Sequence, residues 1–280
     1  MANRRIAIVT DGYRGVGSQI VRYLLVRSKE PLLVYVTGPT AKAADEAVMT
    51  LKQIPDVEAA TWSRKSEIRG IELDYSSRDS IRTFRSNYIS AHGQQSLSIL
   101  VNAPVFREVM LKHKPDDARG IVDSIYFGMR RFTATILHTF KQNGSSRIVN
   151  VTTPQARPKW FQNVELRSQF SNVSNLKTLD DLMNKYVEDY SNKNLVSGGW
   201  GEGPQKTLSS QPFMVAKIGL AAHAMALSKM HHPMLINACS NDIHACHLND
   251  FGSRTAVHLA VGKIGDASGQ FWEDNYRTEW

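Results

Sequence analysis

A glycine-rich segment near the N-terminus has the composition and the setting of a phosphate-binding turn. Gly12, Gly15 and Gly17 follow an apolar run at residues 6–10 and precede a segment with helical spacing at residues 18–25. Glycines between a strand and a helix let the backbone approach a pyrophosphate, and the N-terminus of the helix stabilises its charge. The sequence therefore predicts a dinucleotide-binding site at the start of the chain.

The residues around this turn indicate which dinucleotide is bound. A second apolar run, at residues 32–36, ends without the acidic residue that usually binds the ribose 2′-hydroxyl of NAD. Thr37 and Thr40 follow it instead, and Arg14 lies in the glycine turn, where a guanidinium can pair with a 2′-phosphate. NADP(H) is therefore expected rather than NAD(H). The alternative is that Arg14 is a solvated surface charge.

Phe213 and Lys217, late in the chain, are the next residues whose spacing suggests a site. Phe213 and Lys217 are four residues apart in a segment with helical spacing, so they share one helix face. Together with the glycine turn and Thr153, they make the chain resemble the short-chain dehydrogenase/reductase family, in particular its monomeric carbonyl reductases. That family has Tyr-x-x-x-Lys here, in which Tyr donates a proton and Lys binds the nicotinamide ribose. By the same resemblance, Thr153 replaces a catalytic Ser and Ile125 replaces a catalytic Asn.

The missing hydroxyl group at position 213 limits the chemistry of such a site. A phenyl ring cannot transfer a proton, so the acid–base step of the family cannot use Phe213. Ketone reduction needs a hydride on carbon and a proton on oxygen, whereas iminium reduction needs only the hydride, because the electrons neutralise the nitrogen. Amine–iminium hydride transfer is therefore expected. Two alternatives remain: a carbonyl reductase with its acid relocated to Tyr126 or Glu165, and an NADP(H)-binding pseudoenzyme.

The same loss of polar groups resembles a small group of fungal proteins of prenylated indole alkaloid biosynthesis. That resemblance implies an NADP(H)-dependent oxidase and semipinacolase that converts an indole epoxide to a spirooxindole, or an NADPH-dependent iminium reductase and Diels–Alderase. It also implies that Glu165 is the acid and Arg130 stabilises the oxyanion, while Phe213, Ile125 and Trp160 hold the prenylated indole. Glu165 stands where the reductase group has Asp, which favours the semipinacol rearrangement. Both charged residues can instead be surface charges.

The resemblance to the family also assigns the remaining site residues. Asp74 is expected at the adenine, and the glycine motif departs from the family pattern by Asp11 in place of its first Gly. The segment containing Asn241 and Asp242 stands where the family has Pro-Gly beside the nicotinamide. The expected catalytic residues are Glu165, Arg130, Lys217, Thr153 and Phe213, and no metal ligands are expected. The expected cofactor contacts are Gly12, Tyr13, Arg14, Gly15, Val16, Gly17, Thr37, Leu73, Asp74, Asn102, Lys217 and Ile243.

The elements that position these residues follow a repeated pattern of apolar strands and helices. Six strands are predicted, at residues 6–10, 32–36, 71–74, 97–101, 147–153 and 235–239. Alternation with helices predicts an α/β fold: a Rossmann-type, doubly wound parallel sheet in a single domain of residues 1–280. Residues 154–211 form an insert, with a helix at residues 179–190, that is expected to be a substrate lid. The alternative is that the insert only covers a surface and prevents dimerisation.

The amino-acid composition limits the kinds of molecule that are expected to bind this chain. The net charge is +8, but the basic residues are scattered, so a small anionic cofactor is expected rather than nucleic acid. Apolar residues make up 42% of the chain without a run that could span a bilayer, and no signal-peptide pattern precedes residue 6. Cys239 and Cys246 suit neither a disulfide framework nor a zinc site. We therefore expect a cytoplasmic monomer that acts on a small molecule.

Overall fold

A mostly parallel sheet of eight strands forms the centre of the fold. The structure, a computed structural model, describes residues 4–104, 112–114, 116–201, 211–241 and 251–280. The strand order is β3-β2-β1-β4-β5-β6-β7-β8, and only β8 runs antiparallel to its neighbour. The strands are β1 (Arg5–Val9), β2 (Leu32–Gly38), β3 (Glu67–Glu72), β4 (Leu97–Asn102), β5 (Arg147–Thr152), β6 (Leu235–Ser240), β7 (Phe271–Glu273) and β8 (Tyr276–Thr278).

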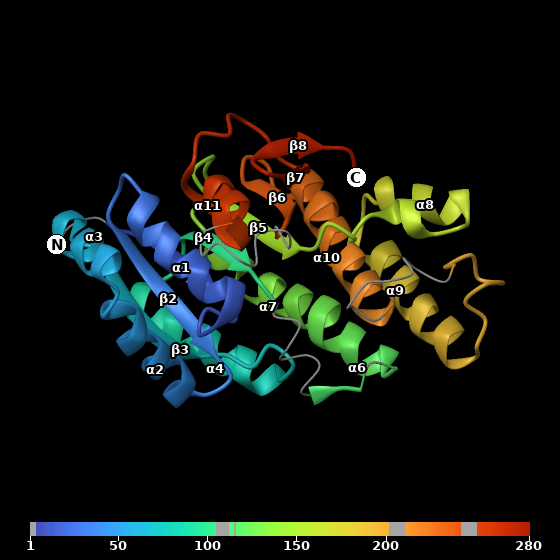
Figure 1. Ribbon diagram of the computed structural model, residues 1–280, viewed down its shortest axis with the longest axis horizontal. Helices are drawn as coiled ribbons and strands as arrows, with labels where there is room; N and C mark the ends of the chain where they lie inside the picture. Colours follow the sequence, from blue (N-terminus) through green and yellow to red (C-terminus); the bar gives the residue numbers. More distant parts are fainter. Residues whose placement is uncertain (1–3, 105–111, 115, 202–210, 242–250) are drawn as a thin grey trace.

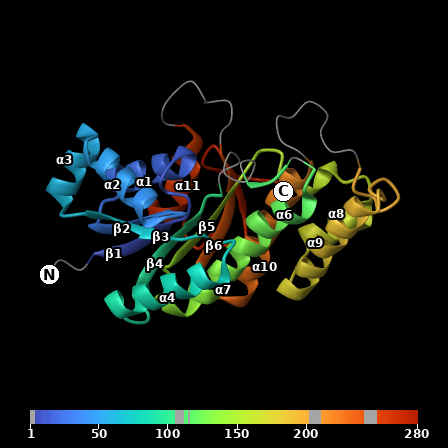
Figure 2. The ribbon, with the colours of Figure 1, turned by 90° about the horizontal axis from the view of Figure 1, so that it is seen from below.

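Helices cover both faces of the sheet (Figures 1 and 2). Two separate apolar clusters fill the two interfaces between the sheet and its helices. The first face is covered by α1 (Gly15–Arg27), α2 (Ala41–Lys52), α3 (Pro55–Arg64) and α11 (Arg254–Val261). The second face is covered by α4 (Arg78–His92), α6 (Ala118–Val122), α7 (Gly128–Ile136) and α10 (Gln211–Met230). The predicted doubly wound α/β fold is confirmed.

The strands predicted from continuous apolar runs are present, but the third was misplaced. The structure has β3 at Glu67–Glu72, and Leu73 and Asp74 follow the end of this strand. The strand forms the edge of the sheet, and Ile68 is its only fully buried side chain. An edge strand with one buried residue has no apolar run to mark it. The short strands β7 and β8 were also missed.

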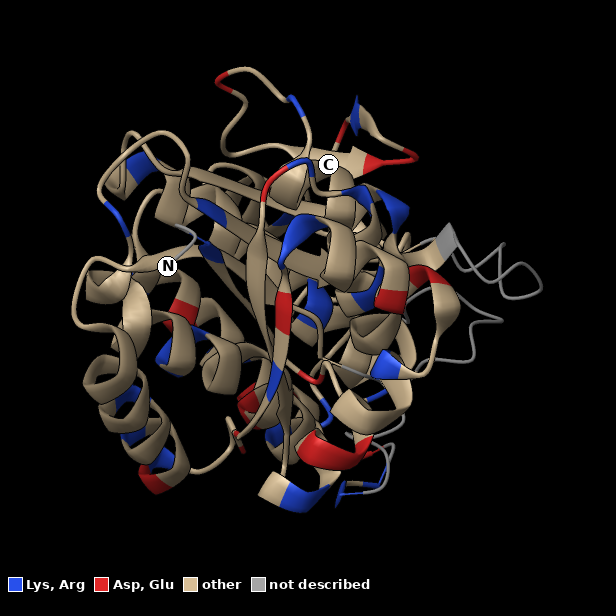
Figure 3. Cartoon of the chain, turned by 90° about the vertical axis from the view of Figure 1, so that its left-hand side faces the viewer, with Lys and Arg blue, Asp and Glu red and all other residues tan. Residues whose placement is uncertain are grey.

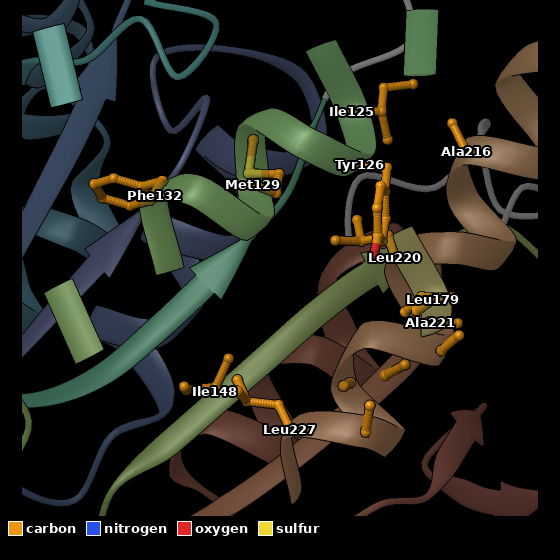
Figure 4. Close-up of a cluster of buried hydrophobic side chains, with 14 of the residues drawn as sticks. Ile125, Tyr126, Met129, Phe132, Ile148, Leu179, Ala216, Leu220, Ala221 and Leu227 are labelled. Atoms are coloured by element: carbon orange, nitrogen blue, oxygen red, sulfur yellow. The ribbon is translucent and has the colours of Figure 1, made fainter. Parts of the chain in front are cut away.

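Helix α10 is the central helix of the second face. By length and composition alone it is apolar enough to cross a membrane, but most of that apolar stretch is buried inside the molecule. It packs against β5 and β6, and the insert helix α9 (Leu176–Ser191) covers its other side. Figure 4 shows this packing, with Leu220 and Ala221 of α10 beside Leu179 of α9. This makes α10 a core helix that carries Phe213 and Lys217 into the interior.

The insert has a small aromatic core of its own. It contains η3 (Pro158–Trp160), α8 (Val164–Ser171) and α9, and the helix predicted at residues 179–190 lies within α9. The indole of Trp200 is fully buried, with ring centroids of Phe161 and Tyr186 at 5.3 and 5.0 Å. The Trp200 Nε1–H donates to Asp189 at 2.8 Å. The insert is therefore a packed element rather than an open loop.

Charged residues of both signs share the surface. Figure 3 shows Lys and Arg interspersed with Asp and Glu on one side of the molecule. Several of these are paired locally, such as Arg22 with Asp56 at 2.6 Å and Arg4 with Glu67 at 2.7 Å. On this side the basic residues are thus spread over many sites rather than gathered in one stripe.

We predict that Gly17→Ala destabilises the turn at the start of α1. A Cβ atom at Gly17 would lie 2.3 Å from the carbonyl oxygen of Asp11, so the backbone must shift. Overpacking of this kind costs about 1–3 kcal/mol of the free energy of unfolding, measured here by urea denaturation. Gly144→Ala is the control, because its Cβ would meet only the Pro233 carbonyl oxygen at 3.8 Å. Equal stability of the two variants would contradict the prediction.

Candidate functional site

The glycine turn forms despite the aspartate in place of its first glycine. Asp11 has φ 49°, in the left-handed region that Asp tolerates better than most residues, and Gly15 has φ 55°. The buried carboxylate of Asp11 accepts a hydrogen bond from the Tyr75 hydroxyl at 2.8 Å. The N–H of Tyr13 donates to the Thr37 carbonyl at 3.2 Å. The turn is therefore closed onto β2, with Gly12 between β1 and α1 and with Gly15 and Gly17 in the first turn of α1.

Three of the expected cofactor residues line one small pocket. Tyr13, Leu73 and Asp74 come together there with Asp11, Pro39, Tyr75, Ser76, Lys112 and Ser124. Burial opposes ionisation of Asp74, but hydrogen bonds from Ser76 and the charge of Lys112 outweigh it, so the pKa of Asp74 is lowered. The Lys112 Nζ lies 3.2 Å from this carboxylate. An ionised acceptor at the end of β3 suits the expected contact with a base.

Arg14 lies against its neighbour in the turn. Its guanidinium donates to the Tyr13 hydroxyl at 2.5 Å and stands 4.5 Å from the centre of the Tyr13 ring. The side chain is half-buried, so the alternative of a fully solvated charge does not describe it. Gly12 is also confined, since a Cβ there would lie 3.0 Å from the Val9 carbonyl oxygen. Val16 is half-buried on the first turn of α1.

Two expected cofactor contacts have a different role. The side chain of Thr37 is fully buried within β2, so only its backbone reaches the turn. The buried amide of Asn102 donates to Thr133 at 3.0 Å and to Asn150 at 2.9 Å, which ties β4 to α7 and β5. The side chains of both residues face the interior, so their expected contact with a cofactor remains a prediction that would involve their backbone atoms. Ile243, Asp242 and Val105 lie outside the described residues.

Lys217 is a buried cation at the carboxyl edge of the sheet. Its Nζ donates to the carbonyl oxygens of Pro104 at 2.8 Å and Val151 at 3.1 Å, and the side chain is 3% exposed. Burial lowers the pKa of Lys217 to about 7, although the charges of Asp11 and Cys239 act in the opposite direction. An amine that titrates near neutral pH can change its charge or transfer a proton under working conditions.

An apolar ring faces this amine. The Lys217 Nζ lies 5.4 Å from the centre of the Phe213 ring, one turn earlier on α10. Phe213 is buried, Ile125 is fully buried, and Thr153 follows β5 with 7% of its surface exposed. Ile125 stands in a π-helical turn, η1 (Asp123–Phe127), between α6 and α7. Such turns often occur at functional sites. Phe213 thus places an apolar ring beside the Lys217 amine, and Ile125 is a buried apolar side chain where the resemblance implied a polar one.

The structure does not bring Arg130 and Glu165 together. The Arg130 guanidinium pairs with Asp180 of α9 at 2.7 Å. Glu165 is exposed in the first turn of α8, where Asn163 caps the helix. The expected burial of Glu165 is therefore absent, and Trp160, with 38% of its surface exposed, lies largely outside the interior as well. The true partner of Arg130 lies in the insert, 15 residues beyond Glu165 in the sequence.

Tyr126, considered above as a relocated acid, has a carboxylate as its hydrogen-bond partner. Its hydroxyl donates to Asp180 at 2.8 Å, and burial with the nearby Asp180 charge raises the pKa of Tyr126 well above 10. Figure 4 shows Tyr126 lying beside Leu220 of α10 in the apolar cluster. Burial likewise raises the pKa of Asp180, although Tyr126 and Arg130 oppose the effect. Tyr126, Arg130 and Asp180 thus fasten the insert to the π-helical turn and α7.

Several important contacts were not anticipated. Thr10 receives the Ala103 N–H at 2.8 Å and joins β1 to the end of β4. Tyr75 and Asp180 were missed as partners of Asp11 and Arg130. The position of Tyr75 directly after Asp74 was the one available signal for it. Among the described residues, no group of three or more His, Cys, Asp or Glu side chains could hold a metal ion.

The chain is similar over its whole length to known reductases. No known protein-family profile matches the chain. Carbonyl reductase [NADPH] 3 of Homo sapiens is 26% identical, with 99% of this chain and 98% of the relative aligned. Short-chain dehydrogenase/reductase 1 of Saponaria officinalis is 22% identical over 99% of this chain and 97% of its own length. The sequence similarity thus extends over the whole chain.

Solved structures show the same fold. Menthone neomenthol reductase from Mentha piperita superposes with a TM-score of 0.76 at 19% identity, over 96% of this chain and 98% of that one. Salutaridine reductase from Papaver somniferum gives a TM-score of 0.71 at 20% identity, over 96% and 100% of the two chains. The chain is therefore similar in sequence to carbonyl reductases and other short-chain dehydrogenases/reductases, and it shares the fold of the two solved reductases.

The lowered pKa of Lys217 leads to a prediction about how the stability of the protein depends on pH. Its folded pKa of about 7 lies below the value of about 10.4 in an unfolded chain. Between these values the unfolded state binds more protons, so the contribution of Lys217 to stability rises with pH, by at most about 1.4 kcal/mol per unit. Urea unfolding at pH 7, 8 and 9 is therefore expected to show a steeper rise for the wild type than for Lys217→Met. Parallel curves would refute the assignment.

The ion pair between Arg130 and Asp180 leads to a prediction about the coupling of these two residues. Both side chains are about three-quarters buried, so their pairing is expected to couple measurably. A double-mutant cycle of Arg130→Met and Asp180→Asn is expected to give an interaction of about 1 kcal/mol or more in urea unfolding. Cleavage of the insert by a protease is expected to accelerate in both single variants. The exposed pair of Lys177 and Asp181 serves as the control, and its double-mutant cycle is expected to show a much weaker interaction because both side chains are solvated.

Proposed function

We propose that this protein is an NADP(H)-dependent reductase that transfers hydride at carbon–nitrogen bonds, with an iminium ion as its substrate. The observation that carries the proposal is the Phe213 ring at 5.4 Å from Lys217 Nζ, where the family has its proton donor. Iminium reduction needs no proton donor, so it is the family reaction that this site can complete. The retained Lys217 and the glycine turn supply the cofactor side of the reaction.

The residues present fit a dinucleotide. Gly17 approaches the Asp11 carbonyl so closely that no Cβ is possible, which keeps the turn tight enough for backbone N–H groups to meet phosphates. Asp74 is an ionised acceptor for the base, and Arg14 in the turn favours a 2′-phosphate. Relatives named as NADPH carbonyl reductases also favour the phosphorylated form. The bound cofactor supplies the hydride.

Lys217 has a role suited to a cationic substrate. A permanent ammonium ion beside an iminium would repel it, whereas an amine with its pKa near 7 can be neutral at the working pH. In its protonated form the same Nζ attracts an anionic cofactor. Phe213 and Ile125 provide an apolar environment that excludes water from the reacting carbon. Thr153 retains the hydroxyl that orients the substrate.

The proposed substrate is a bulky apolar amine, and a prenylated indole alkaloid fits that class. The insert packs against α10, which carries Phe213, and this contact supports its proposed role as a substrate lid. It also covers a face of α10 and is expected to keep the protein monomeric. The semipinacol rearrangement is less well supported, because Glu165 is exposed and Arg130 pairs with Asp180. Neither residue is then placed as the acid or oxyanion contact of an opening epoxide.

Carbonyl reduction is the second candidate, and the names of the relatives favour it. With Tyr126 bound to Asp180 and Glu165 exposed, the described residue best placed to protonate an alkoxide is Lys217. Its pKa of about 7 suits a general acid. In this reading, ketone reduction would decline as pH rises through 7, because the protonated form of Lys217 is lost.

The substitution Phe213→Tyr separates the two candidates. The wild type is expected to oxidise NADPH with a cyclic iminium substrate while ketones and quinones react poorly. Phe213→Tyr returns a hydroxyl to the family position beside Lys217, so ketone reduction is expected to rise by about 10²-fold or more. Turnover is measured as loss of NADPH absorbance.

The matched control is Phe213→Leu, which removes the aromatic ring without adding an acid. It is expected to leave ketone reduction at the wild-type level. If the wild type already reduces ketones as well as iminium ions, and Phe213→Tyr adds nothing, iminium specificity is wrong. Carbonyl reduction through another acid is then the function.

A further inference from the structure

A chain of three hydrogen-bonded side chains stands beside the pocket that contains Asp74. The Nδ1 of His113 lies 2.8 Å from the Asp117 carboxylate, and its Nε2 lies 2.8 Å from the Ser124 hydroxyl. Ser124 is buried in the π-helical turn η1 and lines the same pocket as Asp74. None of these three residues belongs to the glycine turn or to the face around Lys217.

The local backbone is shaped to admit this arrangement. Asp117 caps α6, and its second carboxylate oxygen accepts the Gly120 N–H at 2.8 Å. A Cβ at Gly120 would lie 2.1 Å from the His113 Nδ1 and 2.2 Å from Asp117 Oδ2. Only glycine at this position leaves room for the imidazole between the two side chains. The contacts among Asp117, His113 and Ser124 therefore depend on the local backbone and are not a chance meeting of surface side chains.

The direction of each hydrogen bond follows from Asp117. The hydrogen bond from Gly120 lowers the pKa of Asp117, burial opposes this, and the contact with His113 lowers it further. The ionised carboxylate can only accept, so Nδ1 of His113 carries the proton. In the neutral imidazole Nε2 is then an acceptor, and the Ser124 hydroxyl donates to it. The lone pairs of the Ser124 oxygen are left to face the pocket.

The same connectivity is found in serine hydrolases, but the position of Ser124 does not suit acyl transfer. A nucleophilic serine needs backbone N–H donors aimed at the developing oxyanion. Ser124 lies inside a continuous run of helical turns from α6 to α7, where backbone N–H groups bond within the helix. In the part of the chain that the structure describes, no oxyanion site accompanies it. We therefore infer that His113 and Asp117 orient the Ser124 hydroxyl rather than activate it as a nucleophile.

We propose that Ser124, held as an acceptor by His113 and Asp117, recognises the exocyclic amino group of the adenine base. This rests on the proposed binding of NADP(H), which places the base beside Asp74. An amino group has two N–H donors, and Asp74 and Ser124 supply two acceptors from opposite elements of one pocket. A base with a carbonyl oxygen at that position would meet two acceptors and be rejected. Ser124 is thus a specificity residue, and His113 and Asp117 are positioning residues.

The test compares NADPH with its hypoxanthine analogue, in which a carbonyl oxygen replaces the amino group. Dissociation constants are measured by fluorescence titration at pH 8, where histidine side chains are ordinarily neutral. The wild type is expected to prefer NADPH by about tenfold or more. Ser124→Ala is expected to reduce that preference by about fivefold. His113→Leu is expected to do the same, because the Ser124 hydroxyl is then free to rotate and donate.

The ratio of the two dissociation constants separates recognition from structural damage. A general loosening of the pocket weakens both dinucleotides and leaves their ratio unchanged. Gly120→Ala displaces His113 and is expected to lower the ratio, whereas Ser145→Ala, in an exposed turn, is expected to keep it at the wild-type value. If the ratio of the two dissociation constants is unchanged in both Ser124→Ala and His113→Leu, the inference about Ser124 is wrong while the proposed function stands. Failure of the folded wild type to bind NADPH would overturn the proposed function, and the inference with it.

Discussion

The burial of one cation at the carboxyl edge of the sheet constrains the rest of the site. Lys217 is held by the carbonyl oxygens of Pro104 and Val151, which belong to segments that follow β4 and lie within β5. Desolvation of its ammonium group is costly, and the negative charge of Asp11 offsets part of that cost. Asp11 is itself held by Tyr75. Asp11, which stands in the glycine turn, is thus coupled electrostatically to Lys217, the proposed cofactor-binding lysine.

The chemistry follows from what surrounds that cation. In the proposed site the glycine turn and Lys217 bind the dinucleotide, and Phe213 and Ile125 occupy the two positions at which polar catalytic groups were expected. Hydride transfer requires orientation and exclusion of water, and both survive in an apolar pocket. Protonation of an oxygen requires a donor, and the candidates other than Lys217 are bound elsewhere or exposed. The proposed site therefore favours substrates that need only a hydride, because it can orient hydride transfer but has no dedicated proton donor among the described residues.

Sequence reasoning recovered the features whose signals are local. Strands buried on both faces appear as continuous apolar runs, so β1, β2, β4, β5 and β6 were predicted, whereas β3 at the edge was displaced by several residues. The glycine turn was predicted because its strand, turn and helix are adjacent in the sequence. Side-chain direction was harder, and Thr37 and Asn102 proved to face the interior.

The pairing of Arg130 could not be predicted from the sequence. Its partner Asp180 lies on α9, and only the packing of the insert across α10 and α6 brings the two side chains together. The triad of Asp117, His113 and Ser124 was missed for a similar reason. It depends on the cap of α6 and on the space left by Gly120, neither of which has a periodic signal. Long-range contacts of this kind have no signal in the local sequence.

The most direct test of this account is a calorimetric titration of the purified protein with NADPH and NADH. An intact dinucleotide site with Arg14 in the turn and Lys217 in the interior predicts micromolar or tighter binding of NADPH and at least about tenfold weaker binding of NADH. Lys217→Ala is expected to weaken NADPH further by removing the buried amine. Absence of binding by the folded wild type would show that Asp11 has closed the site, and hydride transfer would then be excluded as its function.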